Sequence, residues 1–237
     1  MRLLIIATLL LLAGCYPDKK RPALAAHQPR HQALSVVRPP DHSNIALRTF
    51  DRLFVTGDFD GDGITDTLTE GNFSNLRHLE IDSGPDWSKN EFETINWWYF
   101  NQQADVYIAF KRPGKDTLHL GEGECLYCLI NIGDNNKDGK DEIAESLVNL
   151  DYSNVSSCKI FSLCNGSWAL LQRIEIHEAA FDIPRDSTIV FTEVPRFLEK
   201  HNGQWFFHDY MWEFDGSGRD TVMKRLKLDR CKKALMH

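Results

Sequence analysis

The stretch Gly57-Asp58-Phe59-Asp60-Gly61-Asp62-Gly63-Ile64-Thr65-Asp66 sets aspartates at alternate positions of a short, glycine-containing loop. A second stretch, Asp134-Asn135-Asn136-Lys137-Asp138-Gly139-Lys140-Asp141-Glu142, repeats this plan. Counted from Asp58 and from Asp134, each loop has an oxygen-bearing side chain at positions one, three, five and nine, and glycine at position six. The agreement of two loops at five positions is the strongest pattern in the chain.

This spacing suits a bound calcium ion, which takes about six to eight oxygen ligands. A tightly curled loop turns alternate side chains inward, and glycine at position six permits the turn that brings the carbonyl of position seven inward. Aspartate, asparagine and glycine also form ordinary turns, but two loops in one register favour metal binding. The predicted calcium ligands are Asp58, Asp60, Asp62, the Ile64 carbonyl and Asp66 in the first loop, and Asp134, Asn136, Asp138, the Lys140 carbonyl and Glu142 in the second.

The two loops differ in charge. The first offers four carboxylates, whereas the second offers three, because Asn136 is neutral. Since the charge of the ligands is one determinant of calcium affinity, the sequence predicts tighter binding at the first loop unless Glu145 joins the second.

Around the loops, short apolar or alternating runs separated by Gly, Asn and Asp predict a single, mainly β domain of antiparallel hairpins over residues 45–237. The expected strands are 53–56, 64–68, 106–110, 117–120, 126–132, 143–148, 159–163, 168–176, 188–192, 196–200 and 204–210. The dipeptides Asn165-Gly166 and Asn202-Gly203 are typical of hairpin turns. A helix is expected around residues 224–233, and the aromatic run 97–100 is interpreted as core.

Residues 57–66 and 133–142 resemble the calcium loops of FG-GAP and VCBS repeats, the kind found in the β-propeller of integrin α chains. In that family an apolar strand precedes the loop and another follows it directly, as the strands expected on either side of both loops would. The resemblance implies calcium-binding, blade-like hairpins. Two clear repeats are fewer than a closed propeller needs, so a partial propeller-like arrangement and a sandwich-like arrangement both remain open.

The EF-hand is the rival family. Residues 134–145 also satisfy its loop pattern, with Glu145 at position twelve. The first loop instead has Thr69 at position twelve, and the glycines before Asp134 are poor for an entering helix. The sequence therefore favours calcium loops between strands over an EF-hand or a dockerin.

The N-terminus is typical of an exported lipoprotein. An apolar run over residues 3–12 is shorter than the roughly 20 residues of a membrane span and fits a signal peptide. The following Leu12-Ala13-Gly14-Cys15 resembles a bacterial lipobox, which implies cleavage after residue 14 and acylation of Cys15. Residues 15–44, rich in Pro and basic residues, are expected to form a disordered tether. Tyr16 rather than Asp after the cysteine favours the outer membrane over the inner one.

Five cysteines remain beyond Cys15, which is an odd number. Outside the cytoplasm thiols tend to oxidise, so a disulfide is expected to link Cys125 or Cys128 to Cys158 or Cys164. Zinc held by these four cysteines, or a redox role for the Cys-x-x-Cys pair, is the less favoured alternative.

The formal net charge of −7 argues against a nucleic-acid partner, because phosphate binding requires a basic face. The sequence contains no nucleophile elbow, Walker loop or zinc-protease helix. These observations favour a lipid-anchored binding or structural module of the cell envelope, with a protein or glycan ligand that the sequence does not identify. A metal-dependent envelope hydrolase is the alternative.

The lipobox predicts that Cys15→Ser abolishes both acyl labelling and stable membrane attachment, because one chain alone binds a bilayer only reversibly and several are needed to anchor it. Metabolic labelling with a radioactive fatty acid, followed by membrane fractionation, measures both. A Cys15→Ser protein that is still labelled and membrane-bound would contradict the assignment.

Overall fold

The computed structural model describes residues 44–181, 190–208 and 222–231. The chain divides into two compact units, residues 1–39 and 40–237, and the described residues all belong to the second unit. The predicted signal peptide, Cys15 and the tether up to residue 43 lie outside the described residues. Among the described residues, no helix combines the length and hydropathy that a bilayer span requires.

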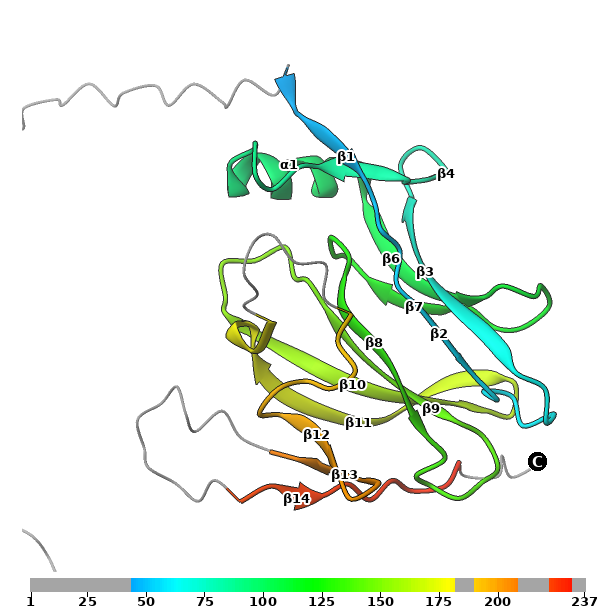
Figure 1. Cartoon of the computed structure of the whole chain (residues 1–237). Helices are drawn as coiled ribbons and strands as arrows, with labels where there is room; N and C mark the ends of the chain where they lie inside the picture. Colours follow the sequence, from blue (N-terminus) through cyan, green and yellow to red (C-terminus); the bar gives the residue numbers. More distant parts are fainter. Residues whose placement is uncertain (1–43, 182–189, 209–221, 232–237) are drawn as a thin grey trace, which may run out of the picture. The chain divides into compact units, whose positions relative to one another are not determined.

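The described chain is built mainly of β-strands, as predicted (Figure 1). In chain order the elements are β1 (Leu47–Thr49), β2 (Phe54–Gly57), β3 (Asp66–Ser74), β4 (Leu79–Glu80), β5 (Ser83–Pro85), α1 (Phe92–Gln102), β6 (Ala104–Phe110), β7 (Leu118–Gly121), β8 (Leu126–Gly133), β9 (Glu142–Leu147), β10 (Val155–Cys164), β11 (Ser167–His177), the 3₁₀ helix η2 (Glu178–Phe181), β12 (Leu198–His201), β13 (Gln204–Phe207) and β14 (Lys224–Arg225).

Every strand pairing in this part of the chain is antiparallel. One sheet has the order β2-β3-β6-β7 with β4 paired to β3, a second has the order β11-β10-β9-β8, and a third has the order β12-β13-β14. A separate two-stranded sheet joins β1 and β5. The prediction of antiparallel hairpins is therefore confirmed.

The β2-β3-β6-β7 sheet and the β8–β11 sheet share one apolar core. Their common cluster includes Leu68, Val106 and Ile108 from the first sheet, and Leu129 and Ile143 from the second. Strand β6 is buried at every second residue, as expected where one face of a strand meets a core. The two sheets thus pack face to face.

The opposite face of the β8–β11 sheet is covered as well. A second apolar cluster joins Ile130 and Ile160 of this sheet to Leu198 and Trp205 of the β12-β13-β14 sheet. The Trp205 indole Nε1 donates a hydrogen bond to the Ile132 carbonyl at 2.7 Å. Because both faces of the β8–β11 sheet are covered, all six residues of β9 are buried.

The aromatic run 97–100 lies on helix α1 and not on a strand. Ile95, Tyr99 and Gln102 are buried on one side of this helix, at the spacing of successive turns. Trp97 and Phe100, by contrast, are 41% and 49% exposed. The interpretation of this run as core therefore holds for Tyr99 and not for Trp97 or Phe100, because helical geometry turns only part of the run inward.

The helix expected around residues 224–233 is also wrong within the described part of that range. Residues 224–225 form β14, which pairs with β13, and Leu226 is buried in the second apolar cluster. Tertiary pairing with β13 overrides the local helix preference of a Lys- and Leu-rich segment. The strand expected at 188–192 is absent from residues 190–192, and its first two residues lie outside the described chain.

Glu145 of β9 is a buried carboxylate of an inner strand. Its neighbour across the β9–β10 pair is Lys159, whose Nζ lies 3.8 Å from Glu145 Oε1. Neither oxygen of Glu145 accepts a hydrogen bond. Burial raises the pKa of Glu145 to about 7, and Lys159 opposes that rise. Because the folded state binds this proton more tightly, the stabilising contribution is full below pH ~4.5 and is lost as the pH rises to about 7.

Glu145→Gln should therefore flatten the pH dependence of stability. At about pH 8.5 the wild type buries a charge that glutamine lacks, so the variant should be more stable by about 1–3 kcal/mol, whereas near pH 4 the two should agree. Urea unfolding at several pH values measures the difference. Glu175→Gln removes an equal charge from an exposed position of β11 and serves as the control. A difference that does not change with pH would contradict the argument.

Candidate metal centres

Each acidic loop connects the two strands of a hairpin, and the two hairpins are built alike. The first loop joins β2 to β3, where Gly57 pairs with Asp66. The second joins β8 to β9, where Gly133 pairs with Glu142. In both, position nine of the loop is the first residue of a buried strand, so Asp66 and Glu142 are 3% and 0% exposed.

The first loop brings carboxylate oxygens of Asp58, Asp60 and Asp66 within 4.8 Å of one another. Asp58 holds the loop closed, because its Oδ1 accepts from the Gly61 amide at 2.8 Å and its Oδ2 from the Gly63 amide at 3.0 Å. Gly61 and Gly63 both have φ +79°, a left-handed conformation that glycine adopts without strain.

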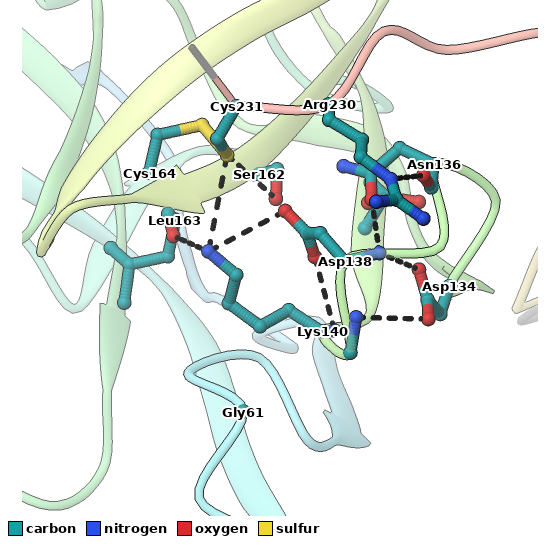
Figure 2. Close-up of polar contacts among 12 residues, drawn as sticks. Gly61, Asp134, Asn136, Asp138, Lys140, Ser162, Leu163, Cys164, Arg230 and Cys231 are labelled. Atoms are coloured by element: carbon teal, nitrogen blue, oxygen red, sulfur yellow. Dashed lines mark hydrogen bonds and ion pairs between the residues drawn. A yellow bond between two sulfur atoms is a disulfide. The ribbon is translucent and has the colours of Figure 1, made fainter. Parts of the chain in front are cut away.

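The second loop gathers carboxylate oxygens of Asp134, Asp138 and Glu142 within 4.8 Å of one another, from positions one, five and nine where the first loop uses one, three and nine. Asp134 accepts from the Asp138 amide at 3.1 Å and from the Gly139 amide at 3.0 Å, as Figure 2 shows. Oε2 of Glu142 accepts from the Asn135 amide at 2.7 Å. Each loop therefore presents three carboxylates to one small volume, which is the arrangement predicted for a cation site.

One oxygen of each strand-opening acid lacks a partner. Asp66 Oδ2 and Glu142 Oε1 are buried and accept no hydrogen bond. Burial, together with the charges of Asp134 and Asp138, raises the pKa of Glu142 to about 7, although the hydrogen bond from the Asn135 amide acts to lower it. A buried, unpartnered carboxylate oxygen is costly, so a group that binds these oxygens would relieve the cost.

Basic side chains approach both clusters. Lys115 and Arg112, from the connection between β6 and β7, lie 2.5 Å from Asp60 Oδ2 and 2.8 Å from Asp66 Oδ1 respectively. The hydrogen bond from Lys115 lowers the pKa of Asp60. In the second loop Lys140 Nζ lies 3.6 Å from Asp138 Oδ2. The protein thus supplies positive charge to each acidic cluster from its own side chains.

Not every predicted ligand joins a cluster. Asp62 lies outside the first one, and its Oδ1 accepts from the Ile64 amide at 2.8 Å. Asn136 is buried beside the second and accepts from the Asp138 amide. The carbonyls of Ile64 and Lys140 stay predictions. Each cluster contains three carboxylates. The structure therefore does not support the prediction that calcium binds more tightly at the first loop, which assumed four carboxylates there and three in the second.

The elements around the second loop are strands β8 and β9, where an EF-hand has helices. Glu145, which would be position twelve of that motif, lies outside the cluster and faces Lys159 instead. Asp141, which the sequence pattern did not select, accepts hydrogen bonds from the Asp58 amide and the Asn131 side chain. Its importance depends on contact between the two loops, which no local motif reveals.

The predicted disulfide is wrong in its pairing. Cys164 is bonded to Cys231, and Cys125, Cys128 and Cys158 are free thiols. Cys128 and Cys158 both pair with Ser146, so β9 separates them. Two strand spacings come to about 9.6 Å, which exceeds the Cα separation of roughly 7 Å that a disulfide spans.

The disulfide attaches the C-terminal segment beside the second loop (Figure 2). Lys140 Nζ donates to the Leu163 carbonyl at 2.6 Å, next to Cys164. Arg230, next to Cys231, donates from Nε to the Asn136 carbonyl at 3.2 Å. The second loop therefore contacts the residues next to both cysteines of the disulfide, Leu163 beside Cys164 and Arg230 beside Cys231.

Comparison of the chain with models of protein families, with curated proteins and with solved structures finds no significant match.

Removing the disulfide should destabilise the domain. The bond closes a loop of 67 residues, which in the chain-entropy model contributes about 4 kcal/mol. We expect Cys164→Ser/Cys231→Ser to lower the melting temperature and the free energy of unfolding in urea. A reducing agent should do the same to the wild type and leave the double variant unchanged. A wild-type melt that is indifferent to reducing agent would contradict this prediction.

Proposed function

We propose that this chain is a lipid-anchored, extracytoplasmic protein that acts as a binding or structural module. Its β domain would be stabilised by two calcium ions, one in each acidic loop. The observation that carries the proposal is the pair of buried oxygens without partners, Asp66 Oδ2 and Glu142 Oε1. They occupy the same place in two hairpins, and each belongs to a cluster of three carboxylates.

The chemistry of the clusters favours a hard cation. All the gathered ligand atoms are carboxylate oxygens, without histidine or cysteine. Oxygen-only sites suit calcium, magnesium and manganese better than zinc or copper. Calcium is the best fit, because it accepts carboxylates and backbone carbonyls in irregular geometry, whereas magnesium retains several waters in a strict octahedron.

The positions of the clusters favour a structural role for the ions. Each cluster joins the start of one strand, Asp66 or Glu142, to the loop that leads into it. A bound ion would therefore fix the loop end of a hairpin that contributes to the shared core. The resemblance to FG-GAP and VCBS loops supports the same role, with each hairpin as part of a blade-like unit.

Two features support export and anchoring. The lipobox-like sequence ending at Cys15 would attach acyl chains, and the Cys164–Cys231 disulfide is of a kind that persists in oxidising compartments. Because Tyr16 rather than Asp follows Cys15, we propose that the lipid anchor lies in the outer membrane. The module would then bind a protein or glycan at the cell envelope.

The calcium proposal predicts that the melting temperature of the whole chain rises in calcium and falls in chelator. An ion that binds only the folded state stabilises it by about 2.7 kcal/mol per site when its free concentration is a hundredfold above the dissociation constant. Asp60→Ala should remove at least half of this calcium-dependent increment, since it deletes a ligand of one of the two sites. Scanning calorimetry with calcium, with magnesium and with chelator measures the increment.

Asp62→Ala is the matched control, because it makes the same change two residues away and outside the cluster. It should retain most of the increment. A wild-type melt that is the same in calcium and in chelator would refute the calcium proposal. An equal loss in both variants would instead place Asp62 among the ligands.

A further inference from the structure

The two acidic loops, 76 residues apart in sequence when counted from Asp58 to Asp134, are bonded to each other. The Asp58 amide donates to Asp141 Oδ2 at 3.1 Å, and the Asp141 amide donates to the Asp58 carbonyl at 2.8 Å. Asp58 opens the first loop and provides one of its clustered carboxylates. Asp141 ends the second loop and directly precedes Glu142, a clustered carboxylate of the other site.

A second set of contacts fixes this junction. Asn131 Nδ2 donates both to Asp141 Oδ2 at 2.9 Å and to the Thr56 carbonyl at 2.8 Å, which ties β8 to β2 just before the loops. A Cβ at Gly57 would lie 2.3 Å from Asn131 Nδ2 and 2.5 Å from Asp141 Oδ2. Any side chain at position 57 would therefore displace Asn131 and Asp141 from this junction.

The loops also meet further along. A Cβ at Gly61 would lie 2.8 Å from Lys140 Cγ and 3.3 Å from the Gly139 carbonyl. Figure 2 shows Gly61 beside the Lys140 side chain. Gly61 binds the Asp58 carboxylate through its amide, and Gly139 binds that of Asp134. The residues that shape one cluster therefore touch the residues that shape the other.

From this junction we infer that the two cation sites are coupled through Asp141, so that an ion in one loop raises the affinity of the other. The inference rests on the proposed calcium sites. An ion that orders the Asp58 carboxylate also orders the backbone amide and carbonyl of Asp58, and with them Asp141 and the adjacent Glu142. The second ion then binds a loop whose ordering has already been achieved. Asp141 belongs to neither cluster and acts as a positioning residue.

Electrostatics opposes this coupling. The first ion reduces the negative potential at the second site, which weakens the attraction for a second cation. Salt screens mainly exposed charges, and Asp66 and Glu142 are 3% and 0% exposed, so added salt should weaken this repulsion only in part. The Asp58–Asp141 hydrogen bonds are short-range contacts, so the coupling that they carry should persist in added salt. The cooperativity between the two ions should therefore not decrease when salt is added.

The test is calcium titration calorimetry of the whole chain in detergent, with one site silenced at a time. Asp60→Ala silences the first loop and Asp134→Asn the second. We expect the wild type to bind two ions cooperatively. Silencing either loop should weaken the other by about fivefold or more, and by the same factor in both directions, because coupling between two sites is reciprocal.

Asp141→Ala should leave two sites but abolish the cooperativity, because it removes the acceptor for the Asp58 amide. Asp141→Asn keeps an oxygen acceptor and should retain the cooperativity, which separates hydrogen bonding from charge. Asp82→Ala, which removes an equal charge at an exposed salt bridge with Arg52, should behave like the wild type.

Each outcome is decisive. Two ions that bind independently in the wild type and in the silenced variants would overturn the coupling and leave the calcium proposal intact, whether or not Asp141→Ala folds. Cooperativity that survives in a folded Asp141→Ala variant would overturn the role of Asp141. Absence of calcium binding in the wild type would overturn the proposed function and the coupling with it.

Discussion

The rest of the structure depends on one constraint, which is the burial of an acidic side chain at the first residue of an inner strand. Asp66 opens β3 and Glu142 opens β9, and both strands run into the core that the two larger sheets share. A carboxylate in such a place needs donors or a cation. Glu142 accepts from the Asn135 amide of its own loop, and Asp66 accepts from the Arg112 guanidinium. Each loop adds two further carboxylates, which themselves require positive charge.

The sequence predicts the loops well because their geometry is local. Within nine residues, the spacing of acids and glycine determines which side chains converge, and the structure gathers three of the predicted carboxylates in each loop. The hairpins follow for a similar reason, since strand alternation and Asn-Gly turns involve neighbours in sequence. The spacing did not predict that Asp62 lies outside the cluster, where its carboxylate accepts a hydrogen bond from the Ile64 amide.

Features that depend on distant residues could not be predicted in this way. Cysteine spacing says nothing about which strands become neighbours, so it did not reveal that Cys164 reaches Cys231 while Cys128 and Cys158 are kept apart by β9. The segment 224–226 has residues that suit a helix, yet pairing with β13 makes part of it a strand. The contact between Asp58 and Asp141 belongs to the same class, since it arises only when two hairpins from different sheets meet.

Glu142 and Glu145 show how the backbone period decides what a buried acid does. They lie three residues apart on β9, and residues at that separation on a strand point to opposite faces. Glu142 therefore reaches the loop cluster, whereas Glu145 shares the face of Ile143 and meets Lys159 of β10. In an EF-hand, position twelve bends back to the ion because a helix follows the loop. Here a strand follows, so the acid at position nine takes that place, and the acid at position twelve needs a basic partner of its own within the sheet.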